Sequence, residues 1–238
     1  MESMRNRFTT ATAALMDRHD DLALVLADIG ADRFRATGAM ERHGRRIVNV
    51  GIREQLMIGV AAGFAMAGYR PIAHTYAPFL VERAFEQIKL DLVHQGLGAM
   101  LVSIGASFDA AAEGRTHQAP GDVALLATLP DLAIHVPGHA DEVEALLRRG
   151  ATQQGTEYVR LAKDGNDEAY PQALDGIVTL SRGSPAAPAV IAVGPMLDPV
   201  AEATADLDVT LGYTVTVRPF DRAWARRAGA VEVVLVEP

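Results

Sequence analysis

The sequence of 238 residues contains no cysteine, which excludes disulfide bonds and every form of thiolate chemistry. It contains no apolar run long enough to cross a bilayer, and no signal-peptide core follows its first residues. It also lacks a cluster of basic residues and carries a formal net charge of −8, which argues against nucleic acid as the main partner. These absences lead us to expect a cytoplasmic protein.

The composition that remains is typical of a globular chain, with 49% hydrophobic and 22% charged residues. Short apolar runs alternate with segments of helical periodicity through the first two thirds of the sequence. The runs predict strands at residues 22–27, 47–50, 71–76, 99–104, 132–136 and 158–161. Strands that alternate with helices indicate an α/β fold, in which helices cover both faces of a parallel sheet.

The alternation stops in a segment rich in proline, glycine and aspartate. We interpret residues 166–188 as a linker that separates a first domain, residues 1–165, from a smaller one, residues 189–238. The second domain is predicted to be a small, incomplete α/β unit. Its predicted elements include a helix at 199–211 and a strand at 214–217.

One acid, Glu54, follows Gly51 at the point where the second predicted strand turns into a helix. That helix is apolar on nearly every side, so we expect it to be buried. An acid in a first helical turn has an ordinary explanation, since it complements the helix dipole. Burial of an unpaired carboxylate is costly, however, and suggests that Glu54 has a partner.

The residues around Glu54 resemble a known family. Gly51-Ile52-Arg53-Glu54-Gln55, the small-residue helix 59–68, Tyr76-Ala77-Pro78-Phe79 and Arg83-Ala84-Phe85-Glu86-Gln87 look like the pyrimidine-binding domain of the transketolase family. This family uses thiamine diphosphate and includes deoxyxylulose-phosphate synthase. The resemblance implies the family's pyrimidine-binding fold, and it is good over residues 22–161 and looser over residues 189–236.

The resemblance also implies cofactor-binding roles. Glu54 matches the glutamate that hydrogen-bonds the N1′ nitrogen of the aminopyrimidine and shares a proton with it, which helps the 4′-amino group to activate C2 of the thiazolium. Phe79 matches the aromatic residue that stacks on the pyrimidine, and Tyr76 lies beside it. Core packing is the alternative for either aromatic residue alone. Asp28 falls where the family often has an acid near the cofactor.

Substrate-binding roles follow from a second motif. Thr116-His117-Gln118, with Glu113 before it, resembles a family loop in which the histidine hydrogen-bonds oxygens of the donor sugar. Glu113 replaces a more usual aspartate that contacts a substrate hydroxyl. Lys163 stands where many relatives have an arginine that grips the substrate phosphate, and lysine keeps the charge without the bidentate fork. The six other histidines show no metal-ligand spacing.

No Gly-Asp-Gly followed by an asparagine-containing loop occurs in the sequence, although the family holds Mg²⁺ and the diphosphate with that segment. We therefore expect a companion subunit to hold them, in an α₂β₂ heterotetramer.

Three functions remain open. The first is the pyrimidine-binding subunit of a two-chain transketolase, which passes a two-carbon ketol unit from a ketose or ketose phosphate to an aldehyde or a carrier-bound acceptor. The second is the β component of a 2-oxoacid dehydrogenase, which shares the fold and the glutamate but lacks the Thr-His-Gln triplet of the sugar-handling branch. The third is a non-catalytic scaffold or regulatory subunit that retains the fold.

Overall fold

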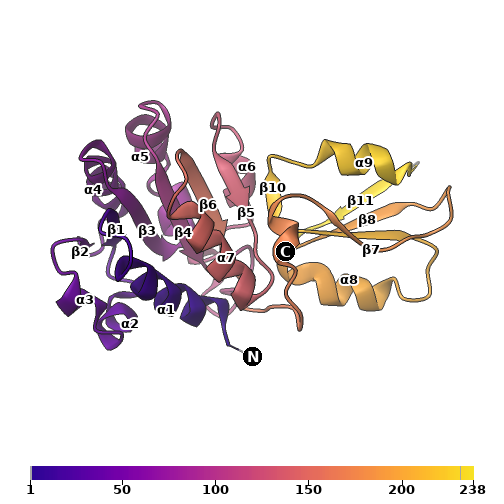
Figure 1. Cartoon of the computed structure of the whole chain (residues 1–238), viewed down its shortest axis with the longest axis horizontal. Helices are drawn as coiled ribbons and strands as arrows, with labels where there is room; N and C mark the ends of the chain where they lie inside the picture. Colours follow the sequence, from indigo (N-terminus) through magenta and orange to yellow (C-terminus); the bar gives the residue numbers. More distant parts are fainter. Residues whose placement is uncertain (1, 231) are drawn as a thin grey trace.

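The computed structural model describes residues 2–230 and 232–238, which form two sheets with helices packed against them (Figure 1). The larger sheet has seven strands in the order β10-β5-β6-β4-β3-β1-β2, and the smaller has four in the order β11-β8-β9-β7. This arrangement confirms the predicted α/β class, a largely parallel sheet covered by helices and followed by a smaller α/β unit.

Continuous apolar runs form the centre of the larger sheet because both of its faces are covered. Its strands are β1 (Leu22–Leu26), β2 (Ile47–Asn49), β3 (Arg70–Tyr76), β4 (Ala99–Ile104), β5 (Ala133–His135), β6 (Thr156–Arg160) and β10 (Thr216–Arg218). All neighbouring strands pair in parallel except β10, which runs antiparallel to β5. Leu24 and Leu26 belong to one buried cluster, and Val25 between them belongs to the other.

Helices α1 and α7 pack together over one face of this sheet, and α4 lies on the other (Figure 1). The helical elements of this part are α1 (Met4–Met16), α2 (Ala31–Ala36), α3 (Ala39–Arg42), α4 (Glu54–Met66), η1 (Pro78–Glu82), α5 (Phe85–Gln87), η2 (Ile88–Val93), η3 (Gly114–Thr116), α6 (Asp122–Leu126) and α7 (Ala140–Gly150). The helical segment between β3 and β4 is not one continuous α-helix, since η1 and η2 are π-helical turns on either side of the short α5.

The smaller sheet lies between two helices, α8 on one side and α9 on the other (Figure 1). Its elements are η4 (Pro171–Leu174), β7 (Val178–Ser181), β8 (Ala189–Val193), η5 (Gly194–Met196), α8 (Leu197–Ala203), β9 (Thr210–Thr214), α9 (Arg222–Ala228) and β11 (Val233–Val236). Strand β7 falls within the predicted linker, 166–188, and β10 of the C-terminal part joins the larger sheet. The division into two domains stays a prediction.

Two sequence-based expectations were wrong in the C-terminal part. The helix predicted at 199–211 ends at Ala203, and strand β9 occupies its predicted last turn; the strand predicted at 214–217 is divided between β9 and β10. Gly212 lies in β9 because the ring of Trp224 packs directly on the backbone at this position. A Cβ atom there would lie only 2.7 Å from the ring, so a larger residue would displace it.

Helix α4 is only half buried, contrary to expectation. Met57, Ile58 and Ala61 pack on the sheet, but Leu56 and Met66 on its outer side are 49% and 69% exposed. Ile52, just before the helix, is 73% exposed. A segment that is apolar on every side gives no periodic signal to separate its two faces. In the described part of the chain, no helix is both long and apolar enough to span a membrane.

Candidate active site

Glu54 begins α4 at the carboxyl edge of the larger sheet, where ligands of open parallel sheets bind. Gly51 before it has φ of +70°, a left-handed conformation that glycine adopts without strain. The Glu54 side chain is only 2% exposed, and its Oε1 atom lies 2.8 Å from Nη1 of Arg83. The structure thus gives the buried carboxylate a cationic partner.

Asn49 joins the ends of β1 and β2 beneath this turn. Its Oδ1 atom accepts hydrogen bonds from the backbone N–H groups of Asp28, at 2.9 Å, and Gly51, at 3.1 Å. Asp28, with φ of +66°, is exposed, and its Oδ1 atom accepts a hydrogen bond from Nδ2 of Asn49 at 3.3 Å. Asn49 therefore shapes the turn that carries Glu54, whereas the expected role of Asp28 near the cofactor stays a prediction.

Arg83 connects Glu54 to the aromatic residue expected to stack on the cofactor. Its guanidinium carbon lies 4.3 Å from the ring centroid of Phe79, within the range of a cation–π contact. Phe79 lies in the π-helical turn η1, and such turns are frequent at functional sites. The motif contained Arg83, but no role was predicted for it.

His117 packs against both predicted aromatic residues. Its ring centroid is 5.1 Å from that of Phe79 and 5.5 Å from that of Tyr76. The Thr116 hydroxyl lies 3.2 Å from the carbonyl oxygen of Glu113 and 2.9 Å from His117 Nδ1. When the hydroxyl donates to the carbonyl, Nδ1 donates to the hydroxyl and Nε2 is left as a hydrogen-bond acceptor. Glu54, Phe79, Tyr76 and His117 thus form one group, although they come from three separate segments.

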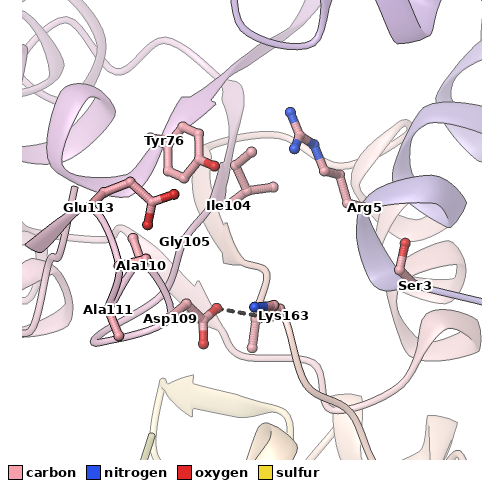
Figure 2. A pocket seen from close by; sticks show the side chains of 12 residues that line it. Ser3, Arg5, Tyr76, Ile104, Gly105, Asp109, Ala110, Ala111, Glu113 and Lys163 are labelled. Atoms are coloured by element: carbon pink, nitrogen blue, oxygen red, sulfur yellow. Dashed lines mark hydrogen bonds between the residues drawn. The ribbon is translucent and has the colours of Figure 1, made fainter.

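A cavity of about 530 Å³ opens beside Tyr76 (Figure 2). Two predicted substrate-binding residues, Glu113 and Lys163, line it. Figure 2 shows Glu113 next to Tyr76, whereas Lys163, on the segment after β6, lies beside Asp109. The cavity therefore has Glu113 beside the aromatic group and Lys163 farther from it.

Two further charged residues line this cavity and were not predicted. Arg5 of α1 points towards it, and its Nε atom is buried without a hydrogen-bond partner in the described residues. Burial and the nearby Arg33 lower the pKa of Arg5. Asp109 accepts a hydrogen bond from the backbone N–H of Lys163 at 2.7 Å, and burial raises its pKa. Neither residue lies in a recognised motif, so no sequence signal marked them.

Gly105 follows β4 and lies against the ring of Tyr76. Its φ is +74°, and a Cβ atom there would lie 2.6 Å from Cδ1 of Tyr76. We expect Gly105→Ala to lower the free energy of unfolding by about 1–2 kcal/mol or more, because a left-handed residue with a side chain is strained and the Tyr76 ring must move. Urea denaturation measures this loss. Gly63→Ala is the control, since its Cβ meets nothing within 4 Å in a helix that alanine favours; equal effects would contradict the expectation.

Comparison with known proteins places the chain in a family. The model of the transketolase pyrimidine-binding domain matches residues 2–165. An uncharacterized 33.6 kDa protein of the fasciation locus of Rhodococcoides fascians is 43% identical over 99% of this chain and 75% of its own length. The 1-deoxy-D-xylulose-5-phosphate synthase 2 of Geobacter sulfurreducens is 31% identical over 81% of this chain. The match spans only 33% of that synthase.

Solved structures agree with the sequence matches. A split gene transketolase, described as an inactive beta4 tetramer, superposes with a TM-score of 0.84 and 25% identity over 99% of this chain and 79% of its own. The transketolase of Leishmania mexicana, at 19% identity, has the same fold with a TM-score of 0.84 over 98% of this chain and 38% of its own. The chain therefore belongs to the transketolase family and carries the family's pyrimidine-binding domain.

Proposed function

We propose that this chain is the pyrimidine-binding subunit of a two-chain, thiamine diphosphate-dependent transketolase. It would transfer a two-carbon ketol unit from a ketose or ketose phosphate to an aldehyde or a carrier-bound acceptor. One observation carries the proposal. A buried carboxylate at the carboxyl edge of the sheet lies next to the aromatic group formed by Phe79, Tyr76 and His117.

The residues around Glu54 fit an aminopyrimidine. In the free chain, the guanidinium of Arg83 contacts the carboxylate at 2.8 Å and lies over Phe79 at 4.3 Å. The guanidinium is flat and rich in N–H donors. The space between the Glu54 carboxylate and the Phe79 ring therefore suits a planar nitrogen compound. When bound, thiamine diphosphate supplies the carbon nucleophile for ketol transfer. Glu54 would hold a proton at the pyrimidine nitrogen, and Phe79 would stack on the ring.

The cavity beside Tyr76 suits a polyol with an anionic end. His117 Nε2 can accept from a substrate hydroxyl, and the Glu113 carboxylate can accept from another. Lys163 and Arg5 also line the cavity and would provide positive charge for a phosphate. Thr116-His117-Gln118 packs into the aromatic group through His117, which favours the sugar-handling branch over a 2-oxoacid dehydrogenase.

A companion subunit would hold Mg²⁺ and the diphosphate, and we propose an α₂β₂ assembly in the cytoplasm. The similarity to a split gene transketolase, which this chain covers to 79% of its length, supports a separately encoded partner. The outer side of α4 offers a contact surface, because Leu56 near its start and Met66 at its end are exposed, as is Ile52 just before the helix. Exposed apolar side chains that gather on a surface are typical of interfaces.

We expect Leu56→Asp to weaken association with the companion subunit about tenfold or more, because it places a charge in the apolar centre of the contact. Sedimentation or light scattering of the mixed chains measures the loss. Leu207→Asp is the matched control, since Leu207 is 60% exposed in the smaller unit, away from α4. Equal weakening by both variants would contradict an interface on α4.

Reconstitution tests the proposed function. The chain is mixed with a separately encoded chain that carries a diphosphate-binding domain, and the pair is supplied with thiamine diphosphate, Mg²⁺ and either a ketose phosphate or pyruvate. We expect cofactor binding that needs both chains and consumption of the ketose phosphate with an aldehyde acceptor. Consumption of pyruvate alone would favour the dehydrogenase component, and a pair that binds cofactor without turnover would favour the scaffold.

A further inference from the structure

We infer that Arg83 occupies the aminopyrimidine position in the isolated chain and must leave it before the cofactor binds. This inference rests on the proposed function, and it concerns how the site is opened. Arg83 would then be a positioning residue that keeps the empty site closed. The partner subunit and the cofactor would displace it together when the active complex forms.

The geometry gives the first reason. A pyrimidine that stacks on Phe79 and hydrogen-bonds Glu54 must use the same ring and the same carboxylate that Arg83 now contacts. In the described residues, Arg83 is also the only ionic partner of the Glu54 carboxylate. A flat ring and a flat guanidinium cannot both lie between these two side chains. Binding of one therefore requires departure of the other.

Hydrogen bonding gives the second reason. The role proposed for Glu54 requires its carboxyl to share a proton with the pyrimidine nitrogen. Nη1 of Arg83 lies 2.8 Å from Oε1 of this carboxyl and occupies one of its hydrogen-bonding positions. Departure of the arginine would therefore free this oxygen for the pyrimidine as well as clear the space.

Arg83 is able to move. Its side chain is 41% exposed, and it follows directly on the π-helical turn η1. One ion pair at a partly exposed position and one cation–π contact are each weak interactions. A ligand that replaces both contacts can therefore displace the guanidinium into solvent. Without the cofactor and without Arg83, Glu54 would be a buried, unpaired charge, which is costly. This cost explains why Arg83 pairs with Glu54 in the empty site.

Binding measurements on Arg83→Met test this inference. Methionine is similar in length but has neither charge nor N–H groups. Two probes are used: the free aminopyrimidine 4-amino-5-hydroxymethyl-2-methylpyrimidine with the full chain alone, and thiamine diphosphate with Mg²⁺ on the reconstituted pair. Calorimetry gives the affinities, and circular dichroism verifies the fold. Lys89→Met is the matched control, because it removes another exposed cation from the following helical segment.

We expect Arg83→Met to bind both probes about tenfold more tightly than the wild type, since the competing contacts are gone. Lys89→Met should leave both affinities unchanged. Arg83→Lys keeps the charge but loses the flat guanidinium, so its affinities should lie between those of Arg83→Met and the wild type. Equal or weaker binding by Arg83→Met would overturn the inference and leave the proposed function intact. If no variant and no wild-type pair binds either probe, the proposed function itself fails, and the inference fails with it.

Discussion

Replacement of Glu54 by glutamine in the reconstituted pair is expected to lower turnover about 100-fold or more, in the range that one positioned acid–base group contributes. Glutamine preserves the length and the hydrogen-bonding shape of the side chain, but it cannot exchange a proton with a ring nitrogen. Cofactor binding should change much less than turnover, because Phe79 and the partner subunit would still hold the molecule. Steady-state kinetics with a ketose phosphate, beside calorimetry of cofactor binding, separate the two effects.

Glu86→Gln is the matched control for this prediction. Glu86 is an exposed acid in α5, two residues beyond Ala84 and outside the predicted cofactor and substrate residues. Its removal changes the net charge in the same way as the Glu54 variant and should leave turnover near the wild-type rate. A Glu54→Gln pair that turns over normally would remove Glu54 from the chemistry and leave only the scaffold function.

The folded chain is expected to lose stability in mild acid because of His74, a fully buried residue of β3. Nδ1 donates to the backbone carbonyl of Val102 at 2.8 Å, and the ring packs on Phe8. Burial, with the positive charges of Arg5 and Arg33, lowers the pKa of His74 from its ordinary value of 6.5 to about 4. The neutral ring is therefore the form that the fold accepts.

The direction of the pH effect follows from this pKa. Above pH 6.5, His74 is neutral in both the folded and the unfolded chain and has no effect. Between pH 6.5 and 4 the unfolded chain binds a proton that the folded chain does not, so the free energy of unfolding falls by about 1.4 kcal/mol per pH unit. The total loss approaches about 3 kcal/mol at pH 4.

Urea denaturation at pH 7 and pH 5 measures this effect. We expect the drop in unfolding free energy between these two values to be about 2 kcal/mol smaller in His74→Gln than in the wild type. Glutamine can keep a donor near the Val102 carbonyl but does not titrate. His94→Gln, at an exposed position, should retain the wild-type drop. An unchanged drop in His74→Gln would show that His74 is not the group that titrates.

The sequence predicted the central part of the fold well because its strands are buried on both faces. Strand β4 coincides with the expected run at 99–104, because a parallel strand that is covered on both faces is almost continuously apolar. Strand β9 was missed. Its glycine serves the packing of Trp224, a contact between distant segments that no local pattern contains. The outer face of α4 was missed because apolar residues surround the whole helix.

The candidate site was likewise predicted where local motifs mark its residues and missed where only contacts between distant segments place them. Glu54, Phe79 and His117 belong to motifs with fixed spacing, and the structure brings them together with Tyr76. Arg5 and Asp109 enter the cavity from α1 and from the loop after β4, so only tertiary structure places them there. The position of Arg83 between an acid and a ring is likewise a property of side-chain conformation. Sequence patterns do not encode such a contact.

Exchange of the C2 proton of bound thiamine diphosphate for deuterium, followed by NMR in the reconstituted pair, tests the role of Glu54 most directly. This measurement needs no substrate, so it is independent of the donor and acceptor. We expect rapid exchange in the wild-type pair and exchange slowed about 100-fold or more in Glu54→Gln, with the cofactor still bound. Equal exchange rates in the two pairs would contradict the assignment of Glu54 as the group that shares a proton with the pyrimidine.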